Sequence, residues 1–232
     1  MPESTGVELR WQALVLAGVG GQGLQTALEV LALAANEIGL EAQTFAPLSL
    51  ARLGGSACCQ LRLGPASTPR ITAGQADLLI VLEMSEVLRV LPLARAGALA
   101  FIATWRRPPL AAGLQGQPYP SQQALAKALQ QREVAGIFVE PRCRGWAKVG
   151  EPETETEEEV PPGLLSLFML AVCCGATGLL PRAALEQALA LRLQERPALA
   201  SIARRLLAAG WLHGRRLELP GEWGLDKSLW LR

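Results

Sequence analysis

Histidine is almost absent from this chain of 232 residues, and cysteines at the spacing of metal ligands are missing. His213, near the C-terminus, is its one histidine, and none of the five cysteines belongs to a Cys-x-x-Cys pair. Metal sites and iron–sulfur clusters need several such ligands, and general-base catalysis most often uses histidine. The sequence therefore predicts that this chain holds no metal and supplies no catalytic residue of its own.

A dominant charge is also missing, because 22 basic side chains face 21 acidic ones. Nucleic-acid binding needs a concentrated basic surface, so this balance gives no reason to expect a nucleic-acid partner. Charged residues make up 19% of the chain and apolar residues make up half. A domain that works alone usually carries more charge, so we expect part of the apolar surface to contact a protein partner.

Residues 1–9 do not have the pattern of a signal peptide. Without such a signal, the five cysteines are expected to be free thiols in a reducing compartment. They are Cys58, Cys59, Cys143, Cys173 and Cys174. We therefore expect a cytoplasmic protein.

Short apolar segments alternate with amphipathic ones through residues 1–150. Strands are expected at 11–17, 41–46, 57–63, 76–82, 98–103 and 136–140, and helices at 24–38, 85–93 and 122–131. Strands that alternate with helices favour a parallel sheet covered on both faces. This part is predicted to be a Rossmann-like α/β domain with a doubly wound, mainly parallel sheet.

Two further segments complete the expected organisation. Residues 151–162 are rich in glutamate and are predicted to form a solvated loop, or alternatively to contact a basic partner surface. Residues 163–232 are predicted to be a helical C-terminal extension that packs on the same domain or on partners, with amphipathic helices near 183–193 and 198–209. Within it, the apolar run at 164–180 is at the short limit for a membrane span. We expect a buried helix there and no membrane span.

The first candidate site is the glycine pattern Gly18-x-Gly20-x-x-Gly23, which follows a strand and opens a helix. A dinucleotide fingerprint has this context, because the glycines allow a tight turn and the helix end attracts phosphate. The fingerprint also needs an acidic residue after the second strand, but no Asp or Glu occurs between Ala42 and Ala76. The turn either contacts a cofactor or lets the strand, the helix and a neighbouring subunit pack closely. Its candidate contact residues are Gly18, Gly20, Gly21, Gln22 and Gly23.

The second candidate site comes just before the strand at 57–63. It contains Arg52, Gly54, Gly55 and Ser56. An arginine grips carboxylate or phosphate with two hydrogen bonds, and glycines allow backbone conformations that other residues resist. The alternative is a surface loop in which Arg52 is solvated.

These segments together resemble the gamma domain of pyruvate/2-oxoacid:ferredoxin oxidoreductases, and within that family the small (beta) subunit of indolepyruvate oxidoreductases. The resemblance rests on GVGGQG at 18–23, the Gly-Gly-Ser loop at 54–56, Leu-Arg-Leu-Gly at 61–64 and the strand that starts at Ala76. It covers residues 14–104 and continues more weakly to the end. Leu53 stands where the family usually has an arginine, and Cys58, Cys59 and Gln60 replace a frequent His or Ser.

The resemblance implies an accessory subunit of a larger enzyme. Such complexes decarboxylate a 2-oxoacid on thiamine diphosphate and pass electrons through iron–sulfur clusters to ferredoxin or another acceptor. In most of them coenzyme A takes the acyl group. Thiamine diphosphate and the clusters would then belong to partner subunits. This chain would complete the architecture and help to shape the entrance to the thiamine or coenzyme A site.

Two other functions remain open at this stage. One is an independent Rossmann-type reductase that binds NAD or FAD. The other is a non-enzymatic nucleotide-binding or regulatory module that is stable alone.

Overall fold

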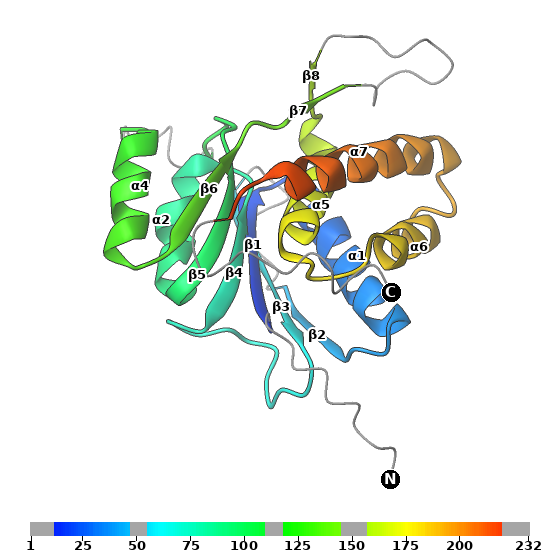
Figure 1. Ribbon diagram of the computed structural model, residues 1–232, viewed down its shortest axis with the longest axis horizontal. Helices are drawn as coiled ribbons and strands as arrows, with labels where there is room; N and C mark the ends of the chain where they lie inside the picture. The colour runs from blue at the N-terminus through cyan, green and yellow to red at the C-terminus, as the bar shows by residue number, and fades with distance from the viewer. Residues whose placement is uncertain (1–11, 47–54, 110–117, 145–156, 220–232) are drawn as a thin grey trace.

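A computed structural model describes residues 12–46, 55–109, 118–144 and 157–219. Its main sheet has six strands in the order β2-β3-β1-β4-β5-β6 (Figure 1). The strands are β1 (Ala13–Val19), β2 (Ala42–Phe45), β3 (Ser56–Leu63), β4 (Ala76–Val81), β5 (Ala94–Ala103) and β6 (Ala135–Val139). The strands β1, β4, β5 and β6 run parallel to one another, whereas β3 is antiparallel to both β1 and β2. The mainly parallel α/β sheet is confirmed, and the antiparallel β3 is an addition that we did not predict.

Helices cover both faces of this sheet (Figure 1). One face carries α1 (Leu24–Glu37), α5 (Leu165–Thr177), α6 (Arg182–Arg192) and α7 (Pro197–Arg216). The other carries α2 (Val87–Val90) and α4 (Gln122–Gln131). The chain thus leaves β1 towards one face and β4 towards the other. In open α/β sheets such a switch point, at the carboxyl ends of the strands, is where ligands bind.

The apolar helix α5 is buried by its own chain, as predicted. All 13 of its residues are buried, between the sheet and α7. Glycines let the two helices approach closely, because a Cβ at Gly175 would lie 2.4 Å from the carbonyl oxygen of Trp211. Gly178 ends the helix, with φ +68°. No helix in the described ranges is long and apolar enough to cross a membrane.

Helix α7 extends seven residues beyond the expected end at residue 209. Gly210 and Gly214 are poor helix formers in isolation, but here they face α5. A Cβ at Gly210 would lie 2.6 Å from the carbonyl oxygen of Phe168. Packing against α5 therefore overrides the local preference.

The prediction of a single helix at 85–93 is wrong in detail. Met84–Glu86 and Leu91–Leu93 form single 3₁₀ turns that flank the short α2. Pro92 has no N–H group to donate, so the segment cannot continue as a regular α-helix.

The last glutamates of the acidic segment belong to a short strand. Glu158 and Glu159 form β8, which pairs antiparallel with β7 (Arg142–Cys143). The guanidinium of Arg142 donates to the carbonyl oxygen of Glu157 at 3.2 Å, and Arg144 forms an ion pair with Glu157 at 3.8 Å. Where a solvated loop was expected, Glu158 and Glu159 form a strand, and Arg142 lies opposite Glu159 in it, so that unlike charges face each other. Residues 151–156 lie outside the described ranges.

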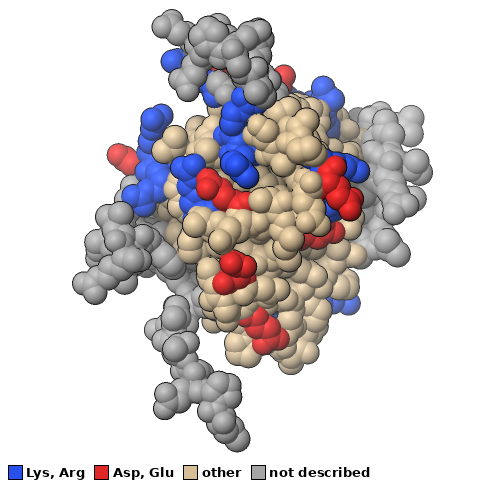
Figure 2. Space-filling view, turned by 90° about the vertical axis from the view of Figure 1, so that its right-hand side faces the viewer, with Lys and Arg blue, Asp and Glu red and all other residues tan. Residues whose placement is uncertain are grey.

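The face formed by α1, α6 and α7 carries charges of both signs. Figure 2 shows basic side chains mainly in its upper half, acidic side chains among them and below, and uncharged surface around both. Arg182 and Glu186 form an ion pair within α6, and Arg192 of α6 forms one with Glu29 of α1. This mixed surface agrees with the near-neutral net charge of the sequence.

Candidate functional site at the carboxyl edge of the sheet

The glycine turn at 18–23 lies at the switch point between β1 and β4. Its Gln22 side chain is 4% exposed and points into the turn. The Oε1 atom of Gln22 accepts a hydrogen bond from the Val19 amide at 2.7 Å, and its Nε2 atom donates to the carbonyl oxygen of Leu82 at 3.3 Å. Gln22 therefore ties the end of β1 to the end of β4.

The two sides of this turn differ in how much space they leave. Gly23, with φ +81°, lies under the start of α5, so that a Cβ there would be 2.6 Å from the carbonyl oxygen of Gly163 and 2.7 Å from Ser166 Oγ. Gly21, with φ +92°, is exposed, and a Cβ there would meet no atom of the described residues within 4 Å. The chain's own helix thus closes the inner side of the turn, while no residue in the described ranges covers the outer side at Gly21.

We expect Gly23→Ala to destabilise the protein more than Gly21→Ala. Each substitution places an L-residue in the left-handed region, which costs about 1–2 kcal/mol. Gly23→Ala adds the collision with α5, whereas Gly21→Ala does not. Urea unfolding followed by circular dichroism compares the two, and an equal loss of stability would contradict this packing.

The structure brings the two predicted glycine clusters together. The amide of Gly20 donates to the carbonyl oxygen of Gly55 at 2.9 Å, so that the turn after β1 touches the residues that lead into β3. Ser56 begins β3 beside them. Arg52 and Gly54, the other two residues of the second cluster, lie outside the described ranges.

A buried carboxylate that we did not predict holds this junction. Glu86 is 3% exposed and accepts from Ser56 Oγ at 2.7 Å and from Arg89 Nε at 2.6 Å. The Arg89 Nη2 atom also donates to the carbonyl oxygen of Ala57 at 2.9 Å. Glu86, in the turn after β4, and Arg89, in α2, thus hold the first residues of β3 in place by hydrogen bonds.

A second buried carboxylate, Glu83, holds the next loop along the same edge. It is fully buried and accepts from the amide of Ser85 at 2.7 Å and from the hydroxyl of Tyr119. The same Tyr119 hydroxyl lies 3.3 Å from the carbonyl oxygen of Trp105, just after β5. Burial, together with the bond to Glu83, raises the pKa of Tyr119, so this hydroxyl remains a proton donor across the physiological range.

A signal for these residues was present in the sequence. Glu83 and Glu86 follow the buried strand at 76–82 directly, and polar residues at the carboxyl ends of parallel strands meet at one edge. Tyr119 is the one tyrosine of the chain but follows no recognisable pattern. Its contact with Glu83 depends on tertiary structure alone.

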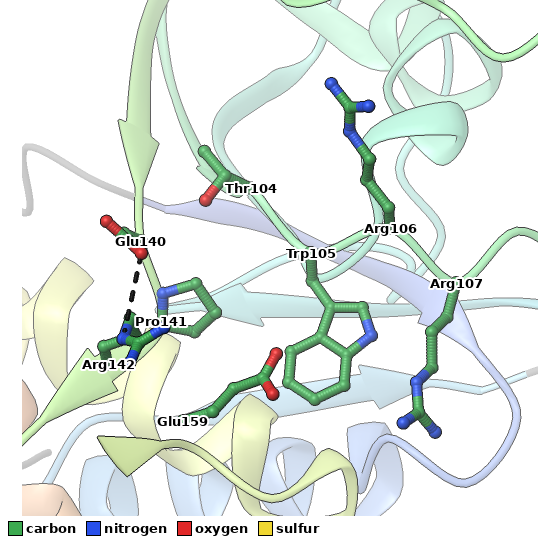
Figure 3. Close-up of a pocket in the computed structure, with 8 residues that line it drawn as sticks. All are labelled: Thr104, Trp105, Arg106, Arg107, Glu140, Pro141, Arg142 and Glu159. Carbon is green, nitrogen blue, oxygen red and sulfur yellow. Dashed lines mark ion pairs between the residues drawn. The ribbon is translucent and has the colours of Figure 1, made fainter. Parts of the chain in front are cut away.

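A cavity of about 280 Å³ lies at the same edge of the sheet, lined by residues that follow β5 and β6. In Figure 3 the ring of Trp105 and the carboxylate of Glu159 point towards each other, while Arg106 and Arg107 extend away from the ion pair between Glu140 and Arg142. Arg107 lies over the Trp105 ring, with its Cζ atom 5.2 Å from the centroid, and Arg106 lies over Tyr119 at 5.6 Å. These contacts connect the cavity with the Tyr119–Glu83 hydrogen bond.

Iron–sulfur clusters do not fit the cysteines of the described residues. No three His, Cys, Asp or Glu side chains come together there in the manner of a metal site. Cys173 and Cys174 are fully buried in α5, and burial raises the pKa of Cys174 to about 12. The thiolate that binds a metal would therefore be strongly disfavoured at this position.

Comparison with known proteins finds one family model and several relatives that match this chain. The family described as pyruvate ferredoxin/flavodoxin oxidoreductase matches residues 13–211. Indolepyruvate oxidoreductase subunit IorB of Archaeoglobus fulgidus is 41% identical over 76 residues, which are 33% of this chain and 38% of that protein. The subunit IorB of Pyrococcus horikoshii is 28% identical over 127 residues, which are 54% of this chain and 62% of that protein. The chain thus spans less than two thirds of the length of these curated relatives.

Solved structures show the same fold. The gamma subunit of a keto/oxoacid ferredoxin oxidoreductase from Geobacter sulfurreducens has a TM-score of 0.59 at 17% identity, over 89% of this chain and 99% of that one. The pyruvate oxidoreductase subunit PORC from Thermotoga maritima has a TM-score of 0.59 at 16% identity, over 87% and 96% of the two chains. Because the family match runs from β1 into α7 and includes both glycine clusters, this chain belongs to the pyruvate ferredoxin/flavodoxin oxidoreductase family.

Proposed function

We propose that this chain is the non-catalytic, gamma-type subunit of a thiamine-dependent 2-oxoacid:acceptor oxidoreductase complex in the cytoplasm. The complex oxidatively decarboxylates a 2-oxoacid, transfers the acyl group to coenzyme A and passes electrons to ferredoxin or another acceptor. The observation that carries this proposal is the family match over residues 13–211. The likeness to subunits named for indolepyruvate supports an aryl 2-oxoacid as the first substrate to test.

In this proposal the partner subunits hold thiamine diphosphate and the iron–sulfur clusters. Two properties of the chain support this division. Its described cysteines do not gather into a cluster site, and its one histidine, His213, is half-buried on α7 beside the ring of Phe168. Burial lowers the pKa of His213, so it remains a neutral packing residue near neutral pH.

The carboxyl edge of the sheet faces the partner's cofactor site in this proposal. The exposure of Gly21 among the described residues and the hydrogen bond between Gly20 and Gly55 support this orientation. A surface without side chains lets another backbone or a cofactor approach closely. Gly20, Gly21, Gly55 and Ser56 then help to shape the entrance to the thiamine or coenzyme A site.

Expressed alone, the chain is expected to be colourless and inactive. The purified chain is incubated with indolepyruvate, pyruvate or 2-oxoglutarate, with coenzyme A and methyl viologen, and no viologen reduction is expected. Addition of partner subunits purified from the native source is expected to produce reduction with at least one of these 2-oxoacids. A brown protein with several irons per chain, or turnover without partners, would show that the chain is an enzyme by itself.

A further inference from the structure

The turn after β4 makes the contacts that hold the two glycine clusters in place. This turn supplies Glu86, whose carboxylate is almost fully buried and bridges two donors from different elements. Ser56 donates from the start of β3 at 2.7 Å, and Arg89 donates from α2 at 2.6 Å. Hydrogen bonds to a buried charge are short and directional, so they fix the positions of both donors.

The contacts of Glu86 reach the glycine turn in one further step. Ser56 follows Gly55, and the carbonyl oxygen of Gly55 accepts the amide hydrogen of Gly20 at 2.9 Å. Arg89 secures the other side of Ser56 through the carbonyl oxygen of Ala57. Displacement of Ser56 would therefore displace Gly55 and loosen the Gly20 turn.

We propose that Glu86 is a positioning residue, which holds Ser56 and Gly55 in register with Gly20 at the edge that faces the cofactor site. This inference rests on the proposed function, because it assigns Glu86 a role in that same site. Glu86 touches no substrate itself and acts through the backbone of the two glycine clusters. Its removal is expected to weaken substrate binding in the assembled complex more than it weakens assembly.

The chain offers a matched control at the opposite edge of the sheet. Asp77, at the start of β4, accepts from Arg95 Nε at 2.6 Å and from the amides of Gln12 and Ala13 at 2.9 and 2.8 Å. Its side chain is 13% exposed, against 4% for Glu86. Asp77→Asn thus removes a comparable carboxylate–arginine pair far from the glycine clusters.

The first measurement is amide hydrogen exchange in the full-length chain, followed residue by residue by NMR. Glu86→Gln keeps the length of the side chain but removes its charge, so the Gly20 amide is expected to exchange at least about tenfold faster, because local opening becomes easier. Asp77→Asn is expected to leave Gly20 unchanged. If Glu86→Gln is too unstable to purify, Ser56→Ala, which removes one of the two bridged donors, replaces it in the same comparison.

The second measurement uses the complex assembled with its native partners. With indolepyruvate, coenzyme A and methyl viologen, Glu86→Gln is expected to raise the KM of the 2-oxoacid or of coenzyme A about tenfold while the yield of complex stays constant, since misplaced contacts reduce binding. Asp77→Asn is expected to leave both KM values unchanged. Equal KM values for wild type and Glu86→Gln, or equal rises in both variants, would overturn the positioning role.

Failure of the proposed function would look different. The wild-type complex would then reduce no viologen with any 2-oxoacid, whereas faster exchange at Gly20 would still establish the mechanical link to Glu86. Unchanged exchange at Gly20 in Glu86→Gln would overturn the link itself, whatever the complex does.

Discussion

Leu170→Asp in α5 is expected to yield aggregated protein or protein that assembles with no partner. Leu170 is fully buried in the core that α5 shares with the sheet and α7. Removal of the leucine loses about 1.5–3 kcal/mol of burial, and the substitution places a carboxylate in an apolar core, which is costly. Since most domains are stable by about 5–15 kcal/mol, this single change threatens the whole fold.

Glu157→Lys is the matched surface change for this comparison. Glu157 pairs with Arg144 at 3.8 Å, and both side chains are more than half exposed. Exposed ion pairs contribute about 0–1 kcal/mol, so the variant is expected to be nearly silent. The soluble yield and the urea midpoint of each variant measure the difference. Soluble, cooperatively folding Leu170→Asp protein would contradict the buried position of α5.

Gly214→Ala is expected to produce the second large loss of stability. In an exposed helix the same change would stabilise by about 1 kcal/mol, because alanine is the better helix former. Here the new Cβ would lie 2.1 Å from the carbonyl oxygen of Val172 and 2.9 Å from the amide of Ala176. The helices α5 and α7 would have to separate, and overpacking of this kind costs about 1–3 kcal/mol or more.

Gly163→Ala serves as the control for Gly214→Ala. Its added Cβ would meet nothing closer than the carbonyl oxygen of Gly21 at 3.9 Å, and its φ angle is not positive. We expect its melting temperature to remain near that of the wild type, while Gly214→Ala melts several degrees lower. If Gly214→Ala melted higher than the wild type, α5 and α7 would not be in backbone contact.

The alternation of strands and helices was readable from the sequence because each buried strand is short, apolar and ended by glycine or a polar residue. The bounds of α1 and α4 lie within one residue of those expected from apolar spacing. In the structure Gly39 follows α1 with a positive φ, and the Ser121 side chain caps the start of α4. The antiparallel direction of β3 was not readable, because a strand between two others looks equally apolar in either direction. The full length of α7 was hidden by Gly210 and Gly214, whose role depends on α5.

The glycines of the candidate site were selected by their motifs, whereas its carboxylates were not selected, and their only signal was their position directly after a buried strand. Gly20 and Gly55 were predicted from motifs, and the structure places them in direct contact. Glu86 and Glu83 belong to no motif, and their burial depends on loops that approach from β3 and from the segment after β5. A sequence pattern records local conformation well, but it does not record which distant donors satisfy a buried charge.

The most direct test of the central claim is affinity purification of the tagged chain from its native source under mild conditions. The eluate is analysed for partner subunits, for thiamine diphosphate and for cluster iron, all expressed per tagged chain. We expect larger subunits to elute together with thiamine diphosphate and iron, and high concentrations of denaturant to return the tagged chain free of both. A tagged chain that elutes alone with bound NAD or FAD would contradict the proposal and identify an independent reductase.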